Sequence, residues 1–177
     1  MTEHRVGFLR WRSDLPSGGN RYDDELAARL PGLGIAVRAY PIAGPWPCPT
    51  PADRRCLAAT LDAEQHWLIG NIVASGAPDI LAAATAQGRR VTLLLHYFPA
   101  DDPGLPETDR RRLGASEAAA VRFADTVVVT SAWAARAVAE RYGRHDVVVA
   151  APGVDSAEPP TDRWGEGVRR RCCGWAA

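Results

Sequence analysis

The 177-residue sequence predicts an α/β fold, a Rossmann-like three-layer sandwich around a mainly parallel six-stranded sheet. Short apolar runs alternate along the chain with alanine-rich runs of helical spacing, which is the pattern of a parallel sheet with helices on both faces. The run from Val91 to His96 is the clearest buried strand, because its apolar and β-branched residues are continuous. A chain that is 46% hydrophobic and 24% charged can bury one substantial core at this length.

Six runs have the composition of strands, and a helical segment separates each from the next. The strand-like runs cover residues 6–11, 35–40, 66–69, 91–96, 126–130 and 147–149. The helical segments cover residues 21–30, 53–63, 78–87, 109–123 and 132–142. Right-handed crossovers between parallel strands then leave a few possible strand orders.

Local signals mark where some of these segments begin and end. Asp53 is the predicted N-cap of the second helix, and Gly88 and Gly143 follow the third and fifth helices. Segment 41–51 is dense in proline, which lacks the N–H group that a sheet interior requires. We therefore expect segment 41–51 to be a loop.

Charge and cysteine content exclude several classes of protein. The 21 basic residues are all arginine and balance 21 acidic residues, so we expect no nucleic-acid partner. Without lysine, the chain has no Schiff-base or P-loop lysine. The cysteines lack C-x-x-C spacing, so neither a zinc site nor a redox dithiol is predicted for Cys48, Cys56, Cys172 and Cys173. The amino terminus has no signal-peptide pattern, and no apolar run approaches ~18 residues, which predicts a cytoplasmic protein without a membrane span.

The end of the first strand carries a candidate phosphate site. Ligands of a doubly wound sheet bind outside the carboxyl ends of its strands, and segment 17–22 follows such an end. There Gly18 and Gly19 open a helix, whose amides and positive end suit a phosphate; the alternative is a flexible turn. The dinucleotide fingerprint G-x-G-x-x-G is absent, which disfavours a nicotinamide-dependent enzyme.

Three further polar residues follow or precede later strands. His96 ends the fourth strand, where its ring either exchanges a proton with a substrate hydroxyl or is satisfied by neighbouring backbone. Ser131 opens the last helix, so capping is its first role and ligand contact its second. Glu117 lies on the helix before the fifth strand, and its position in that helix does not show whether its carboxylate faces solvent or a binding site.

Together these positions resemble the amino-terminal half of the family 4 retaining glycosyltransferases of the GT-B type. The resemblance extends over residues 5–157 and rests on segments 17–19, 68–73, 94–96, 117–131, 142–143 and 151–155. It implies one half of a GT-B fold, in which two Rossmann-like domains face each other across a cleft. In that family a hexose moves from a nucleotide-sugar donor to an acceptor hydroxyl with retention.

The resemblance also implies roles for individual residues. Gly18 and Gly19 would lie near the donor diphosphate and the acceptor, and His96 would contact the transferring sugar as a catalytic residue. The loop of Asn20, Arg21 and Tyr22 would shape the acceptor pocket. Ser131 and Glu117 complete the predicted substrate-binding set. No metal and no other cofactor is implied.

The domain organisation departs from that of the family. Its donor site lies chiefly in a second domain, whereas only 22 residues follow Asp155 here. We therefore expect a truncated or split chain, with an acceptor-side domain over residues 1–157 and a disordered or non-native tail over residues 158–177. Such a chain would be inactive without a second Rossmann-like domain. A non-catalytic Rossmann-like binding module or subunit is the alternative, and a sugar epimerase of related architecture ranks third.

Overall fold

The computed structural model describes residues 4–12 and 17–153 of the chain. The predicted domain boundary at residue 157 and the predicted tail, residues 158–177, lie outside this part. The described strands are β1 (His4–Trp11), β2 (Ile35–Ile42), β3 (His66–Gly70), β4 (Arg90–Leu95), β5 (Thr126–Val129) and β6 (Val147–Val149). The described helices are α1 (Gly18–Arg29), α2 (Pro51–Leu61), α3 (Asn71–Gly76), α4 (Pro78–Ala86), α5 (Glu107–Phe123) and α6 (Ala132–Tyr142), with short 3₁₀ helices η1 (Leu30–Leu33) and η2 (Pro99–Asp101).

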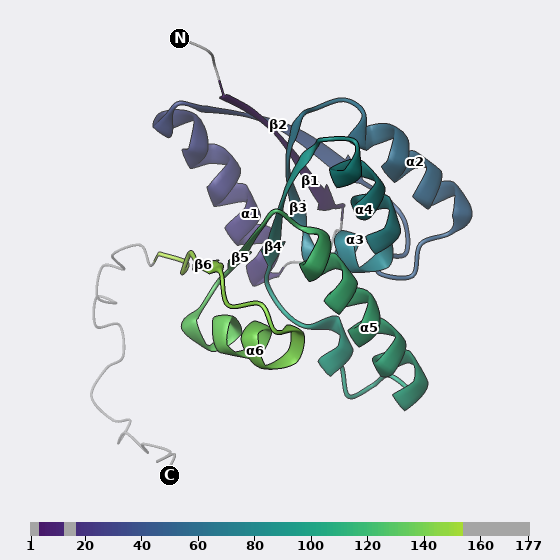
Figure 1. The fold of residues 1–177 in the computed structure, drawn as a ribbon. Helices are drawn as coiled ribbons and strands as arrows, with labels where there is room; N and C mark the ends of the chain where they lie inside the picture. The colour runs from purple at the N-terminus through teal and green to yellow at the C-terminus, as the bar shows by residue number, and fades with distance from the viewer. Residues whose placement is uncertain (1–3, 13–16, 154–177) are drawn as a thin grey trace, which may run out of the picture.

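The six strands form one parallel sheet in the order β2-β1-β3-β4-β5-β6 (Figure 1). The predicted α/β class and Rossmann-like architecture are therefore confirmed. From β1 the chain crosses to β2 at the edge, and it then passes β1 again to reach β3. The order thus reverses between β1 and β3, the position at which doubly wound sheets bind ligands.

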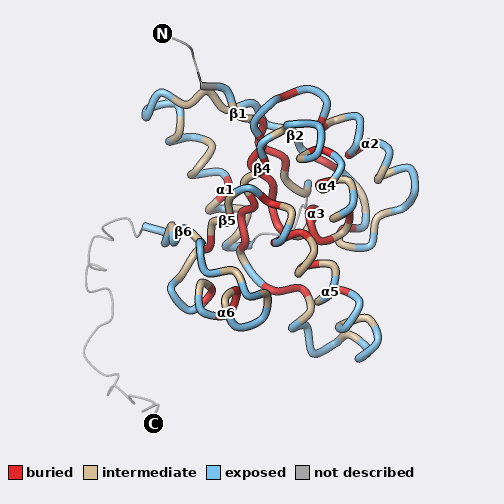
Figure 2. The backbone as a smooth tube through the Cα atoms, viewed as in Figure 1, coloured by how far each residue is buried: buried red, intermediate tan, exposed pale blue. Residues whose placement is uncertain are grey.

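Helices cover both faces of the sheet, although very unequally. Helix α1 lies on one face of the sheet (Figure 1). There Phe8, Leu68 and Leu94 pack against residues of α1, including Tyr22 and Leu26. The opposite face holds the larger core cluster, to which α2, α3, α4, α5 and α6 all contribute buried side chains. Figure 2 shows this burial concentrated along the central strands. Strand residues alternate between the two clusters because successive side chains of a strand point to opposite faces.

Two helix starts differ from the sequence-based prediction. Helix α1 begins at Gly18 instead of residue 21, because the Ser17 hydroxyl accepts a hydrogen bond from the amide of Asn20 and caps the helix. The predicted N-cap Asp53 is wrong. Thr50 caps α2, and Asp53 is the third helical residue, whose carboxylate accepts a hydrogen bond from the Thr50 amide in a capping box.

Two other stretches were mis-assigned from sequence. Strand β2 continues through Pro41 to Ile42, inside the segment predicted as a loop. Because β2 is an edge strand with β1 as its neighbour, Pro41 removes no hydrogen bond from the sheet interior. Helix α3 was not predicted, since it has only 6 residues and too few positions for an apolar period. In the described part of the chain, no helix has both the length and the apolarity needed to cross a bilayer.

Candidate active site at the carboxyl ends of the strands

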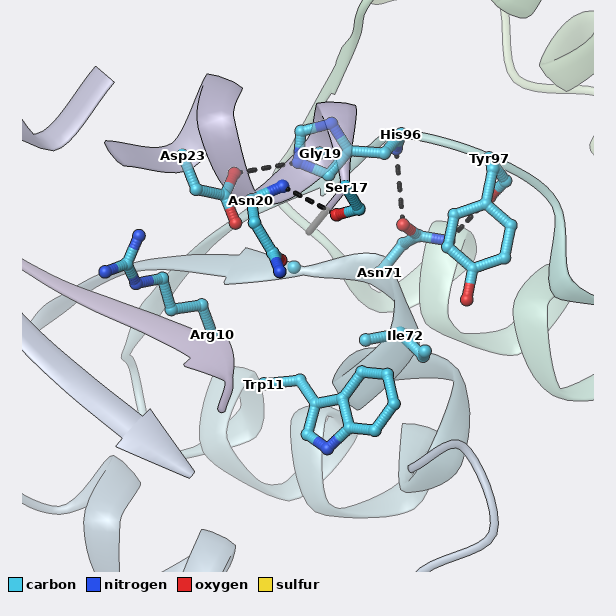
Figure 3. A pocket seen from close by; sticks show the side chains of 11 residues that line it. Arg10, Trp11, Ser17, Gly19, Asn20, Asp23, Asn71, Ile72, His96 and Tyr97 are labelled. Carbon is cyan, nitrogen blue, oxygen red and sulfur yellow. Dashed lines mark hydrogen bonds and ion pairs between the residues drawn. The ribbon is translucent and has the colours of Figure 1, made fainter. Parts of the chain in front are cut away.

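A cavity of about 360 Å³ lies at the point where the strand order reverses (Figure 3). Its walls come from the carboxyl ends of β1, β3 and β4, from the first two turns of α1 and from the start of α3. The lining residues are Arg10, Trp11, Ser17, Gly19, Asn20, Asp23, Gly70, Asn71, Ile72, His96 and Tyr97. The fold therefore brings residues of the β1–α1 unit together with segments 70–72 and 96–97, which lie far along the sequence.

His96 is the most heavily constrained side chain of this cavity. It follows directly after β4, and its Nε2 lies 2.8 Å from Oδ1 of Asp23. One ring face rests on Gly19, where an added Cβ would meet Cγ of His96 at 3.5 Å. The ring of Tyr22 meets the imidazole edge to face, with 5.3 Å between ring centroids. The imidazole side chain remains 15% exposed, so a ligand in the cavity can reach it.

Asn71 connects the ends of β3 and β4. It is the first residue of α3 and is 2% exposed. Its Oδ1 accepts a hydrogen bond from the amide of His96 at 3.2 Å, and its Nδ2 donates to the carbonyl of Tyr97 at 2.7 Å. Both ends of the Asn71 side chain are thus used to fix the backbone that carries His96.

Charges of both signs border the cavity. Arg10, at the end of β1, pairs with Asp24 through Nη1 and Oδ1 at 2.5 Å. The Asp23 carboxylate is 8% exposed and faces His96. Burial raises the pKa of the neighbouring Tyr22, and the Asp23 charge raises it further. Tyr22 therefore stays protonated, and its hydroxyl donates to the carbonyl of Ala150 at 2.9 Å.

The comparison with family models decides the kinship of the chain. Residues 4–158 match the sequence model described as Glycosyltransferase Family 4. The chain belongs to Glycosyltransferase Family 4. The predicted resemblance is therefore confirmed. Among curated proteins, no sequence matches this chain.

A solved structure supports the fold of this Family 4 chain. It is an alpha-glucosyltransferase in complex with UDP and a 13-mer DNA containing an HMU base, and it superposes with a TM-score of 0.55 at 14% sequence identity. The match covers 84% of this chain and 42% of that chain. The chain thus corresponds to less than half of that protein's length. At this identity the likeness concerns the fold, of which the six-stranded unit forms one Rossmann-like half.

Three of the residues predicted for the site line the cavity of this Family 4 chain, namely Gly19, Asn20 and His96. Gly18 lies between two lining residues, at the first position of α1. The expectation that Asn20, Arg21 and Tyr22 form a loop is wrong, because the Ser17 cap starts α1 before them. Arg21 and Tyr22 lie outside the cavity lining, and Tyr22 packs against the sheet.

Ser131 and Glu117 lie apart from the cavity. Ser131 is the N-cap of α6, where its hydroxyl accepts a hydrogen bond from the amide of Ala134 at 3.1 Å. Glu117 is 1% exposed on α5, and the Tyr142 hydroxyl donates to its Oε2 across 3.3 Å. Burial raises the pKa of Glu117 to about 7. In the described ranges, no three side chains of the His, Cys, Asp and Glu types form a group that could hold a metal ion.

Sequence reasoning did not identify Asp23, Arg10 and Trp11 as lining residues. A signal for Asp23 exists, because Gly19 and Asp23 are four residues apart and share one face of a helix. Using that signal required placing the start of α1 at Gly18, which depends on recognising Ser17 as the cap. Trp11 offered no signal, since its indole N–H donates to the carbonyl of Gly44, 33 residues later in the chain.

Proposed function

We propose that this chain is the acceptor-side domain of a glycosyltransferase that moves a hexose from a nucleotide-sugar donor to an acceptor hydroxyl, with retention of the anomeric configuration. One observation carries the proposal: in a chain of Glycosyltransferase Family 4, a buried carboxylate and an imidazole meet in a cavity at the reversal of strand order. Membership of the family supports sugar transfer, and the cavity supports binding at this position.

The size and lining of the cavity suit a sugar. Ligand cavities are usually about 300–1,000 Å³, so a cavity of about 360 Å³ accepts one ring of hexose size more readily than a long polymer. Trp11 and Ile72 give the cavity an apolar wall, and Asn20 and His96 give it groups that hydrogen-bond hydroxyls. Sugars present both kinds of surface.

The start of α1 suits the donor diphosphate. Sugar transfer leaves negative charge on the departing diphosphate, and the amides at a helix N-terminus stabilise such charge. An added Cβ at Gly18 would meet no described atom within 4 Å, so packing does not require glycine there. Close approach of a phosphate to the backbone would require glycine at position 18. A solved structure of related fold carries UDP, the leaving group of a uridine-diphosphate sugar.

His96 is proposed to contact the transferring hexose. Positive charge grows on the sugar in the transition state while bonds to the diphosphate lengthen, so a fixed hydrogen-bond partner at a sugar hydroxyl orients the reacting carbon. The proposed reaction uses a second Rossmann-like domain that binds the nucleotide, and it uses no metal and no other cofactor from this chain. The second domain faces the carboxyl ends of β1, β3 and β4 across a cleft.

A reconstitution experiment tests this function. The chain is assayed alone and joined to the donor-side domain of a Family 4 glycosyltransferase, with a panel of nucleotide sugars and hydroxyl acceptors. We expect transfer from the joined protein, with retained configuration in the product by NMR, and none from the chain alone. His96→Ala should abolish transfer. His66→Ala is the matched control, because His66 is exposed at the opposite end of β3.

Two outcomes would contradict the proposal. A joined protein that binds no nucleotide sugar rules out the donor site. Binding without transfer under any acceptor favours the alternative function, a non-catalytic Rossmann-like binding module or subunit that uses the same cavity.

A further inference from the structure

We propose that Asp23 and Asn71 are positioning residues that together hold His96 in one orientation and one tautomer. This inference rests on the proposed function of the cavity, since it assigns a purpose to a fixed His96. Asp23 acts on the ring from α1, and Asn71 acts on the backbone from α3. Neither residue needs to touch the substrate.

Asp23 fixes the protonation pattern of the ring. Its Oδ1 lies 2.8 Å from Nε2 of His96, and an ionised carboxylate can only accept a hydrogen bond. Nε2 must therefore carry the hydrogen, which leaves Nδ1 without one whenever the ring is neutral. The contact is shielded, because the side chains of Asp23 and His96 are 8% and 15% exposed. A shielded hydrogen bond of this kind competes well with water.

The neighbouring charge does not weaken this assignment. Arg10 lines the same cavity, but its Nη1 pairs with Asp24 at 2.5 Å. The Asp23 carboxylate is hydrogen-bonded to His96. Asp23 and Asp24 thus have separate partners, although they are adjacent in α1.

Asn71 fixes the backbone from which the imidazole projects. Its amide oxygen accepts from His96 N and its amide nitrogen donates to Tyr97 O, at 3.2 Å and 2.7 Å. Only a side chain with both an acceptor and a donor can do this, so aspartate, which could accept from His96, could not donate to Tyr97. The choice of asparagine at this position therefore has a structural reason.

Packing completes the constraint on the ring. Gly19 supports one ring face, and Tyr22 meets the imidazole edge to face. With Nε2 held by Asp23, rotation of the ring breaks a hydrogen bond. A reacting group that is displaced by about 1 Å can lose about a hundredfold in rate, which is why such supporting contacts matter for catalysis.

Nitrogen-15 NMR of the histidine-labelled chain measures the tautomer of His96 and so tests the proposal without any assay of sugar transfer. At alkaline pH, where the rings are neutral, we expect the His96 signals of the wild-type chain to show the Nε2–H tautomer. His96→Gln identifies the signals by their loss. An Nδ1–H tautomer in the wild-type chain would overturn the proposal.

Matched variants separate the two positioning residues. Asp23→Asn should weaken the preference for the Nε2–H tautomer, because an amide can donate to Nε2 as well as accept from it. Asn71→Asp should keep the Nε2–H tautomer. In the joined enzyme both should lower kcat about ten- to a hundredfold and change KM for the donor less than about threefold. Glu25→Gln is the control on the same helix, because Glu25 pairs with the exposed Arg29 and does not line the cavity; it should change neither the tautomer nor kcat.

The possible failures can be told apart. An unchanged tautomer in Asp23→Asn, or wild-type kcat in Asn71→Asp, overturns the corresponding half of the inference. If the wild-type joined enzyme transfers no sugar, the proposed function fails. The tautomer measured in the chain still decides whether Asp23 fixes the ring.

Discussion

Glu117 shows how burial alone can change the acid–base behaviour of a residue. Its side chain is 1% exposed between α5 and α6, and its Oε1 has no hydrogen-bond partner in the described structure. Burial disfavours the charged carboxylate and raises its pKa from 4.5 to about 7. Hydrogen bonds from the Ala100 backbone and, to a lesser extent, from the Tyr142 hydroxyl oppose this rise, and the bond from Tyr142 to Oε2 is long at 3.3 Å. Glu117 is therefore a residue of the core whose charge depends on pH near neutrality.

Glu117 should make the domain less stable as the pH rises. The folded state holds a proton that the unfolded state releases near pH 4.5, so stability falls from about pH 4.5 to about pH 7 and then levels off. The total loss is at most about 3 kcal/mol. Glu117→Gln should remove this dependence and be the more stable protein at pH 8. Urea unfolding from pH 5 to pH 8 measures the free energy of unfolding of both proteins. If that free energy changes equally with pH in the wild type and in Glu117→Gln, the prediction is wrong.

Gly18 should matter for ligand binding more than for stability. It is the first residue of α1, and an added methyl group meets no described atom within 4 Å. Gly18→Ala should leave the free energy of unfolding unchanged or raise it by up to about 1 kcal/mol. Binding of UDP to the joined enzyme should weaken at least about tenfold, as calorimetry can measure, because the methyl group occupies the space proposed for the diphosphate.

Gly114→Ala is the matched control for Gly18→Ala. Gly114 also lies in a helix, α5, where an added Cβ would meet Cβ of Ala100 at an ordinary 3.7 Å. Its substitution should leave UDP binding unchanged. Equal UDP affinity of Gly18→Ala and the wild-type enzyme would show that no phosphate approaches Gly18.

At the scale of elements, hydroxyl caps decide where three helices begin. Ser17, Thr50 and Ser131 cap α1, α2 and α6, and each hydroxyl accepts a hydrogen bond from the amide three residues later. Two of these caps have consequences for different parts of the molecule. The cap of α1 sits in the cavity wall, whereas α2 contributes no residue to the cavity.

The two caps should therefore have equal energetic effects and unequal effects on the site. Thr50→Ala and Ser17→Ala should each reduce the free energy of unfolding by about 1 kcal/mol. Ser17→Ala should also shift the NMR signals of His96, because the first two turns of α1 carry Gly19 and Asp23. Thr50→Ala should leave those signals in place. A shift of the His96 signals in both variants would contradict this separation.

At the scale of the molecule, Tyr22 joins the beginning of the domain to its end. Its hydroxyl on α1 donates to the carbonyl of Ala150, which is 128 residues later and directly follows β6. The amide of Ala150 in turn donates to the carbonyl of Val129 in β5. The edge of the sheet is thus held from α1 as well as from β5.

Tyr22→Phe should loosen that edge. Loss of one hydrogen bond should cost about 1 kcal/mol of stability and speed hydrogen exchange at the Ala150 amide. Tyr40→Phe is the control, because the Tyr40 hydroxyl donates to Glu64 at 2.9 Å. The control should lose similar stability without faster exchange at Ala150. Unchanged exchange at Ala150 in Tyr22→Phe would show that β5 alone holds this segment.

The site was partly predictable because its residues lie at strand ends. Runs of apolar residues locate the ends, and His96 and Gly19 were found in this way. Asp23 was missed because the start of α1 depends on a single serine hydroxyl, and helix ends are weak signals in sequence. Glu117 was placed with the site, but α5 turns it into the core beside Tyr142. The position of a residue in a helix does not show which other element that face of the helix packs against.

The sequence alone determined the class of fold and the six strands, because apolar period and turn residues are properties of neighbouring positions. The kinship with family 4 glycosyltransferases rested instead on the resemblance of particular segments, and the family model confirms it. The tertiary structure decided the strand order, and with it the convergence of α1, β3 and β4 around His96. It also decided that Asp23 and Asn71 hold this histidine. These contacts join residues 73 and 25 positions apart. Such pairings depend on how strands are ordered in space, which no local pattern encodes.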